Sequence, residues 1–197
     1  MIYVTLEYGQ FEKGSKRAER NVEVAIAVCD SRGEILRHCI VIAAGATPLN
    51  EYESFIYYHH NQPKWHETFK LSIPFEKISV AHLRVGFRHV AKNEGKDKMD
   101  KTFAFSYLKI MQDNGAIIPD GTHELYVYKA EGKKWHDPSF YLAVESAKGV
   151  GGQLPSHKDR TIRGKTLSTI INIDGTPSSG THSVLSLIHI SEPTRPY

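Results

Sequence analysis

The chain has 197 residues, of which 40% are hydrophobic, and this is enough to form the packed core of one ordinary domain with a tail. Its two cysteines, Cys29 and Cys39, are too few for a disulfide framework, and the absence of any N-glycosylation sequon likewise favours a reducing, intracellular setting. A formal net charge of +3 is too small to indicate nucleic-acid binding by itself, and no stretch approaches the roughly 20 apolar residues of a membrane span.

Short runs of alternating apolar and polar residues predict β-strands along most of the chain. They lie at residues 2–8, 21–30, 34–42, 53–59, 66–73, 81–89, 102–111, 123–129 and 139–145. These runs are rich in Val, Ile, Tyr and Phe, turn sequences such as DSRG and PDGT separate them, and helical periodicity is scarce. The sequence therefore predicts an all-β fold, an antiparallel β-sandwich that ends near Glu145.

The last quarter of the chain has a different composition. Residues 146–184 are rich in Gly, Ser, Thr, Pro, Lys and His, which indicates a linker or a divergent, largely disordered tail. Within it, only STIINI at 168–173 is apolar enough to suggest a strand. The final segment, 185–197, begins with LSLIHIS, the in-frame translation of a transposon end used in sequencing libraries. We interpret this segment as adapter-derived rather than native, and Met1 need not be the natural start.

Two predicted loops are rich in basic residues. The first, at 12–20, carries Lys13, Lys16, Arg17 and Arg20. The second, at 88–101, carries Arg88, Lys92, Lys96, Lys98 and Lys101 among three acidic residues. If the sandwich brings both loops to one end, they form a concave cationic site that suits polyphosphate head groups, because separate Lys and Arg side chains can contact separate phosphates. The alternative is that both loops are simply solvated.

A third loop, YYHHNQPKWHE at 57–67, contains three histidines beside Trp65. Adjacent His59 and His60 would point to opposite faces of a continuing strand, and with His66 they match no defined ligand spacing. We therefore expect no metal site here, and we expect Trp65 to seal the core.

Catalytic motifs are weak throughout the chain. The sequence RGKT at 163–166 ends like a phosphate-binding loop, but Asp159 stands where that loop requires a glycine. Cys29 and Cys39 fall within predicted strands, where a buried, inert thiol is expected rather than a nucleophile. The chain is therefore predicted to be no enzyme and to need no cofactor.

Several long segments occur in an informative order. They are YVTLEYGQFEKGSK, RNVEVAIAV, NEYESFIYYHHNQPKWHETFKLSIP, HLRVGFRH and DGTHELYVYKAEGKK. In this order they resemble the dedicator-of-cytokinesis (DOCK) proteins over residues 2–145. The match is to DOCK homology region 1, the lipid-binding C2-type domain of these large guanine nucleotide exchange factors, and most resembles their Rac-directed branch. The resemblance implies an eight-stranded C2-type antiparallel sandwich with inserted loops, and no family helical repeat is recognised after Ser146.

The resemblance also implies binding of phosphatidylinositol 3,4,5-trisphosphate at the basic-loop end. The residues that match this surface are Lys13, Lys16, Arg17, Arg20, Arg88, Lys92, Lys96 and Lys98. These loops lack the paired aspartates with which other C2 domains hold Ca²⁺. A cytoplasmic parent protein would thus be recruited to the inner face of the plasma membrane, while regions outside this chain would act on a Rac-type GTPase and engage an ELMO-type adaptor.

Two other functions stay open on the sequence alone. A protein-interaction β-sandwich would contact its partner through exposed sheet edges or the 57–67 loop, with the basic loops solvated. Charge-driven lipid recruitment weakens steeply with ionic strength, whereas an edge-strand contact depends on it much less. Nucleic-acid binding is disfavoured because no aromatic residues are interleaved with the basic clusters.

Overall fold

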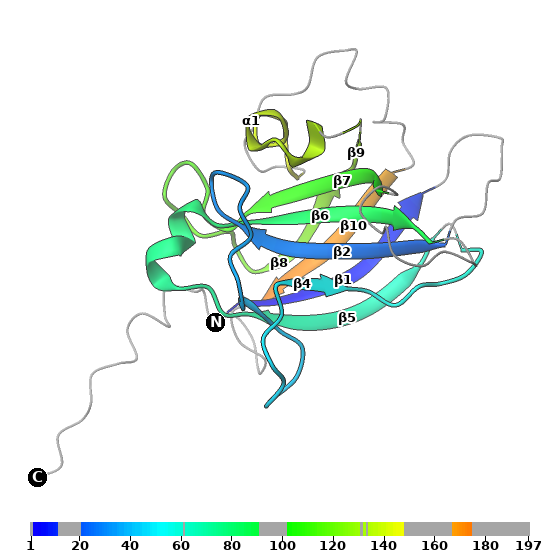
Figure 1. The fold of residues 1–197 in the computed structure, drawn as a ribbon, viewed down its shortest axis with the longest axis horizontal. Coiled ribbons are helices and arrows are strands. Elements are labelled where there is room, and N and C mark those ends of the chain that lie inside the picture. The colour runs from blue at the N-terminus through cyan, green and yellow to red at the C-terminus, as the bar shows by residue number, and fades with distance from the viewer. Residues whose placement is uncertain are drawn as a thin grey trace, which may run out of the picture.

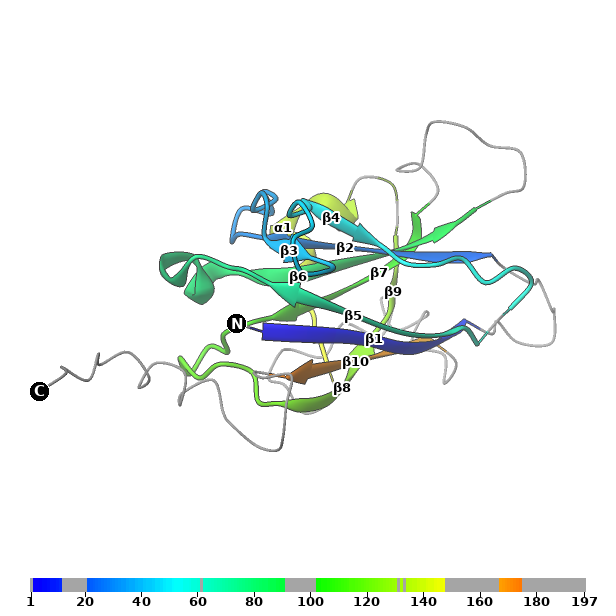
Figure 2. The ribbon, with the colours of Figure 1, turned by 90° about the horizontal axis from the view of Figure 1, so that it is seen from below.

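The computed structural model of the chain describes residues 2–11, 21–60, 62–90, 102–130, 132, 134–147 and 167–174. These residues form two five-stranded sheets that pack face to face (Figures 1 and 2). Every strand pairing among them is antiparallel. The prediction of an all-β, C2-type antiparallel sandwich is confirmed.

The first sheet, called the β1 sheet, has the strand order β3-β5-β1-β10-β8. Its strands are β1 (Ile2–Phe11), β3 (Ile40–Val41), β5 (Lys64–Leu71), β8 (Gly121–Tyr126) and β10 (Leu167–Asp174). The side chains of Ile2, Val4 and Leu6 are buried, while those of the residues between them are partly exposed. This alternation is the period of a strand with one face on the core.

The second sheet, called the β2 sheet, has the strand order β4-β2-β6-β7-β9. Its strands are β2 (Val22–Cys29), β4 (Glu51–Glu53), β6 (His82–His89), β7 (Thr102–Lys109) and β9 (Tyr128–Lys129). The 3₁₀ helix η1 (Phe75–Val80) joins β5 to β6. The described residues thus contain ten strands, two of them only two residues long, where the resemblance implied eight.

An aliphatic and aromatic core fills the space between the sheets. Large side chains that are fully buried include Leu6, Ile26, Phe69, Leu83 and Phe87. They come from both sheets, and burying each one contributes roughly 1.5–3 kcal/mol relative to leaving it exposed. This core fixes which strand ends lie side by side.

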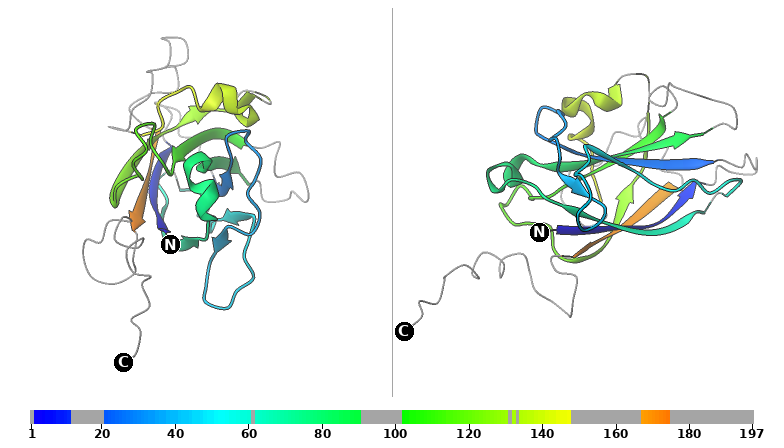
Figure 3. Two further views of the ribbon diagram at one scale, coloured as in Figure 1. Left: turned by 90° about the vertical axis from the view of Figure 1, so that its left-hand side faces the viewer. Right: turned by 60° about the horizontal axis from the view of Figure 1, so that its bottom comes forward.

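A second cluster of aromatic residues lies on the outer face of the β2 sheet. It contains Phe105, Tyr107, Tyr128, Trp135 and Tyr141. The last two belong to the short helices η3 (Lys134–His136) and α1 (Pro138–Tyr141), which cover this face (Figures 2 and 3). The phenolic hydroxyls find partners at the edge of the cluster, as in the 2.6 Å hydrogen bond from the Tyr128 hydroxyl to the Glu145 carbonyl.

Three predicted strands are shorter than expected or absent. In the 34–42 run, only Ile40–Val41 form a strand, because Asp30 Oδ1 accepts hydrogen bonds from the amides of Arg32 and Glu34 and holds the preceding residues in a turn. The 53–59 run is strand only at its beginning, since β4 ends at Glu53.

The predicted strand at 139–145 is wrong. Residues 138–141 form α1, for which Asp137 is the N-cap and accepts a hydrogen bond from the amide of Ser139 at 2.9 Å, with Pro138 in the first turn. The apolar residues at 140, 142 and 144 imitate the period of a strand. The capping sequence immediately before them decided the local structure.

The expected end of the sandwich near Glu145 is too early. Strand β10 lies between β1 and β8 and pairs with both, from Leu167 opposite Phe11 to Asp174 opposite Tyr3. The sequence predicts a strand at this apolar run but places it in the tail, because nothing local identifies a partner strand so distant in sequence. Residues 175–197, which include the segment interpreted from the sequence as adapter-derived, lie outside the described residues.

Candidate functional site

The two basic segments are attached to neighbouring strand ends. Residues 12–20 connect β1 to β2, and residues 91–101 connect β6 to β7. The first residue of β2, Val22, pairs with the last residue of β6, His89. On the other side of β6, the first residue of β7, Thr102, pairs with the residue before that histidine. Three of the four attachment points therefore lie next to one another in the β2 sheet.

The fourth attachment point, the end of β1, lies across the core from them. The ring of Phe11 is 5.1 Å from that of Phe87 and 6.0 Å from that of Phe103, measured between centroids. Phe11 thus ties the end of the β1 sheet to the end of the β2 sheet. We call this part of the sandwich the loop end and define it by the four strand-end residues Phe11, Val22, His89 and Thr102 (Figure 1).

Asn21 fastens a third connection to the loop end. Its backbone carbonyl accepts a hydrogen bond from the amide of Val90 at 3.0 Å, and its side-chain Nδ2 donates to the Val90 carbonyl at 2.9 Å. Its Oδ1 accepts from the amide of His59 at 3.0 Å. Tyr57 forms a β-bridge with Val22. The connection between β4 and β5 therefore reaches the same end as the basic segments.

Trp65 anchors the other side of this connection. The indole is buried against Phe11, with 6.3 Å between ring centroids, and its Nε1 donates to the carbonyl of Phe55 at 2.9 Å. The carbonyl of Pro63 accepts from the amide of Gly9 at 3.1 Å. The prediction that Trp65 seals the core is confirmed.

The histidines of this connection do not converge on one point. His59 and His60 are exposed, and His66 is paired with Glu7 at 2.6 Å between Nδ1 and Oε2. In the part of the chain that the structure describes, no group of three or more His, Cys, Asp or Glu side chains could hold a metal ion.

Arg88 is the only one of the eight predicted head-group residues that the structure describes. The other seven lie outside the described residues: Lys13, Lys16, Arg17, Arg20, Lys92, Lys96 and Lys98. The side chain of Arg88 is only 7% exposed and lies among three carboxylates, at 2.6 Å from Glu51, 3.0 Å from Glu53 and 3.7 Å from Glu23. Arg88 is thus bound by protein carboxylates, whereas the family resemblance predicts that it contacts lipid phosphates.

The acidic neighbours of Arg88 also decide its protonation. Burial alone would lower the pKa of Arg88, but the hydrogen bond to Glu51 and the charges of Glu51, Glu53 and Glu23 raise this pKa above its ordinary value. The guanidinium therefore stays charged and joins the end of β6 to β2 and β4. Arg88 acts as a support beneath the loop end.

A group of exposed aromatic residues that the sequence pattern does not predict also lies at this end. Phe55 is 75% exposed, Tyr58 is 60% exposed and Tyr57 is 39% exposed. The predicted strand at 53–59 includes them, but the adjacent pairs YY and HH break the alternation that a half-buried strand requires. This break in period was the available signal.

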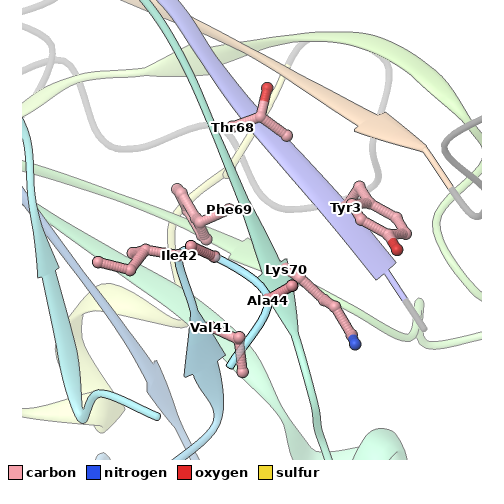
Figure 4. A pocket seen from close by; sticks show the side chains of 8 residues that line it. Tyr3, Val41, Ile42, Ala44, Thr68, Phe69 and Lys70 are labelled. Atoms are coloured by element: carbon pink, nitrogen blue, oxygen red, sulfur yellow. The ribbon is translucent and has the colours of Figure 1, made fainter. Parts of the chain in front are cut away.

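A shallow recess lies on the β1 sheet beside its edge strand β3 (Figure 4). Its volume is about 310 Å³, and it is lined by Tyr3, Val41, Ile42, Ala43, Ala44, Thr68, Phe69 and Lys70. Lys70 is the only charged residue in this lining. Ligand pockets usually combine apolar walls with several convergent polar groups, so the recess does not indicate a particular ligand.

The two cysteines are both buried and free. Burial raises the pKa of the Cys29 thiol to about 11 and raises that of Cys39 in the same direction. The prediction that both cysteines are buried is confirmed. A thiol that stays protonated is a poor nucleophile, so their inertness remains the expectation. Within the described residues, no helix is long and apolar enough to cross a membrane.

Comparisons with known proteins cover most of the chain. A family model described as the C2 domain in Dock180 and Zizimin proteins matches residues 1–176. Dedicator of cytokinesis protein 4 of Homo sapiens is 44% identical over 150 residues, which are 76% of this chain and 8% of that protein. Dedicator of cytokinesis protein 3 of Mus musculus is 39% identical over 148 residues, which are 75% of this chain and 7% of that protein.

These matches extend the predicted resemblance. The family model continues past residue 145 and includes β10, in agreement with the place of that strand in the β1 sheet. The chain spans only a small part of the curated relatives it matches. From the two-sheet fold and the extent of these matches, we conclude that this chain belongs to the family of C2 domains of the Dock180 and Zizimin, or DOCK, proteins.

Proposed function

We propose that this chain is the phosphoinositide-binding and membrane-targeting module of a DOCK-family guanine nucleotide exchange factor directed at a Rac-type GTPase. The observation that carries the proposal is the shared attachment of both basic segments, since residues 12–20 and 91–101 each start and finish at the loop end. Membership of the DOCK C2 family supports the same assignment.

The proposed ligand is phosphatidylinositol 3,4,5-trisphosphate. Its phosphates would be contacted by Lys13, Lys16, Arg17, Arg20, Lys92, Lys96 and Lys98. Each basic residue near an anionic membrane surface contributes about 1 kcal/mol, so several of them acting together give useful affinity. Arg88 has a supporting role in this proposal, because its guanidinium is already bound by Glu51 and Glu53.

Catalysis and protein partners belong to other regions of the parent protein in this proposal. Nucleotide exchange on a Rac-type GTPase and binding of an ELMO-type adaptor would take place outside this chain. The C2 domain would bring the cytoplasmic parent to the inner face of the plasma membrane, where the proposed lipid lies.

The test is co-sedimentation of the full 197-residue chain with lipid vesicles. One set contains phosphatidylinositol 3,4,5-trisphosphate, and the other has the same total charge supplied by phosphatidylserine. The proposal expects preferential binding to the first set. Equal binding would reduce the loop end to a nonspecific basic surface, and binding to neither would contradict a membrane function and favour a protein-interaction domain.

Charge reversal at the loop end provides the matched variant. Lys13→Glu, Lys16→Glu and Arg17→Glu together should abolish the preference for trisphosphate vesicles, because they reverse three of the proposed phosphate contacts. The control reverses the same number of exposed charges away from the loop end, at Arg32, Arg37 and Lys77. Equal loss in both triple variants would show a general charge effect and no head-group site.

A further inference from the structure

We propose that the connection between β4 and β5 inserts aromatic side chains into the lipid interface beside the head-group site. We call Phe55, Tyr57 and Tyr58 the aromatic tip. The inference rests on the proposed membrane function and adds to it a hydrophobic contact. The loop end would then bind a bilayer both by charge and by burial of aromatic side chains.

The first observation is the exposure of three large side chains within four residues. Phe55 is 75% exposed and Tyr58 60% exposed, with Tyr57 beside them at 39%. Single exposed hydrophobic residues are normal on protein surfaces, but a local group of this kind marks an interaction surface. The side chains of the aromatic tip contribute little to the core, so their types need another explanation.

The second observation is that the backbone beneath the tip is held in place. The carbonyl of Phe55 accepts a hydrogen bond from buried Trp65, Tyr57 is bridged to Val22, and the amide of His59 donates to Asn21. A segment fixed in this way loses little conformational freedom when it binds. The tip is therefore a prearranged contact surface.

The third observation is the position of the tip relative to charge. Tyr57 pairs with Val22, the first residue of β2, which only Asn21 separates from the basic segment 12–20. Asn21 also joins this connection to Val90, directly before the second basic segment at 91–101. An anionic bilayer is complementary to such a surface, because basic residues meet its phosphates while tyrosines prefer its interfacial zone.

Figures 1 and 2 show this connection projecting beyond the ends of β2 and β6, at the opposite end of the sandwich from η1. The far end provides a close match for comparison. Phe75, in η1, is 76% exposed, almost the same as Phe55. A bilayer that contacts the loop end leaves Phe75 in water. Comparing variants of the two ends therefore distinguishes membrane insertion of the aromatic tip from nonspecific adsorption through any exposed hydrophobic side chain.

The test uses single tryptophan replacements in the full chain, Tyr58→Trp and Phe75→Trp. Each variant is mixed with vesicles that contain phosphatidylinositol 3,4,5-trisphosphate and lipids brominated in their acyl chains, which quench nearby indoles. The native Trp65 and Trp135 are buried and give a background measured on the unchanged chain. We expect added quenching in the Tyr58→Trp variant only. Equal fluorescence with brominated and ordinary lipids in that variant would overturn insertion.

A binding measurement gives the second readout. Combined Phe55→Ser and Tyr58→Ser replacements should weaken vesicle binding about tenfold, through loss of buried apolar area, and the loss should persist at high salt. Phe75→Ser should change binding by less than about twofold.

The outcomes separate the two proposals. If the unchanged chain binds neither trisphosphate nor phosphatidylserine vesicles, the membrane function and the inserted tip both fail. If it binds vesicles but shows neither quenching at position 58 nor loss in the double serine variant, only the inserted tip fails. Retained vesicle binding with lost affinity for a protein partner would assign the tip to protein recognition instead.

Discussion

The two sheets of this domain differ in how they use their outer faces. All eight residues of β2 are buried. One face of the β2 sheet packs on the core, and the other face carries the Arg88 ion cluster and the aromatic cluster. In the β1 sheet, buried and partly exposed residues alternate along β1, and the outer face is polar where the hydroxyls of Thr5 and Thr68 lie 2.8 Å apart. The β2 sheet is thus stabilised from both sides, and the β1 sheet from one.

This difference matters for the loop end. Three of the four attachment points of the basic segments belong to the β2 sheet, whose networks hold them in place. The β1 sheet supplies the fourth, and it depends on β10, which arrives from more than 150 residues away along the chain from β1. Substitutions in the β2 sheet should therefore disturb the loop end by breaking its side-chain networks. Loss of β10 should disturb it by removing a partner strand of β1.

The largest effect should come from removing β10. A chain that ends at Ala147 leaves β1 and β8 without the strand that joins them, and exposes two unpaired edges. We expect loss of cooperative thermal unfolding, followed by near-ultraviolet circular dichroism. A chain ending at residue 176 should keep the transition, and a cooperative transition at the same temperature in the shorter chain would contradict the assigned place of β10.

Removing the charge of Arg88 should be the next largest effect. Arg88→Met leaves buried Glu23 close to two further carboxylates without their cation, which should cost about 3–5 kcal/mol in the free energy of unfolding. Urea denaturation measures this loss. Adding Glu23→Gln should recover part of it, because it removes the buried negative charge. A loss below about 1 kcal/mol in the single variant would mean that the cluster is solvated.

Acid should destabilise the β2 sheet through His82. Its ring is buried beside the Tyr141 hydroxyl at 2.7 Å, and burial, with the charge of Arg84, lowers the pKa of His82 to about 4. Between the ordinary pKa of about 6.5 and this value, the unfolded state binds more protons, so stability falls as pH falls across this window.

The total loss attributable to His82 should approach about 3 kcal/mol near pH 4, measured by urea denaturation at several pH values. His82→Gln removes the titrating group, so the variant should show a shallower dependence between pH 6.5 and 4. Identical slopes in both proteins would show that His82 is not the group responsible.

The smallest effect should come from removing the side-chain hydrogen bonds of Asn21 at the loop end. Asn21→Ala removes the two side-chain hydrogen bonds, to the Val90 carbonyl and from the His59 amide, and should cost about 1–3 kcal/mol, measured by urea denaturation. Asn50→Ala is the matched control, because exposed Asn50 accepts one comparable bond from the amide of His38. Equal losses in both variants would show that Asn21 has no special role at the loop end.

Strands with clear alternation could be predicted from the sequence alone. The strands predicted at 2–8, 21–30 and 81–89 agree with β1, β2 and β6 within a few residues, because a buried face imposes its period on the residues that form it. The prediction of a strand at 139–145 is wrong because the apolar spacing there fits a strand, while Asp137 and Pro138 begin a helix. β10 was recognised as an apolar run, but its partners depend on contacts between distant segments.

The basic composition of the candidate site could be predicted from the sequence, but its spatial arrangement could not. The basic segments 12–20 and 91–101 are visible in the sequence, yet their shared attachment depends on the pairing of β2 with β6 and the packing of Phe11. The position of Arg88 could not be derived, since Glu51 and Glu53 reach it through the pairing of β4 with β2 and of β2 with β6. Charge runs predict what a surface attracts, while the folded neighbours decide which charges are available.

The most direct test of the central claim is a backbone amide NMR titration of the full chain with the soluble head group of phosphatidylinositol 3,4,5-trisphosphate. We predict that the largest shifts occur in the two basic segments and in residues near their attachment points, at Gly9, Asn21 and Val90. Shifts confined to η1 and the far end, or no shifts at saturating head group, would contradict the assignment of the loop end as the lipid-binding surface.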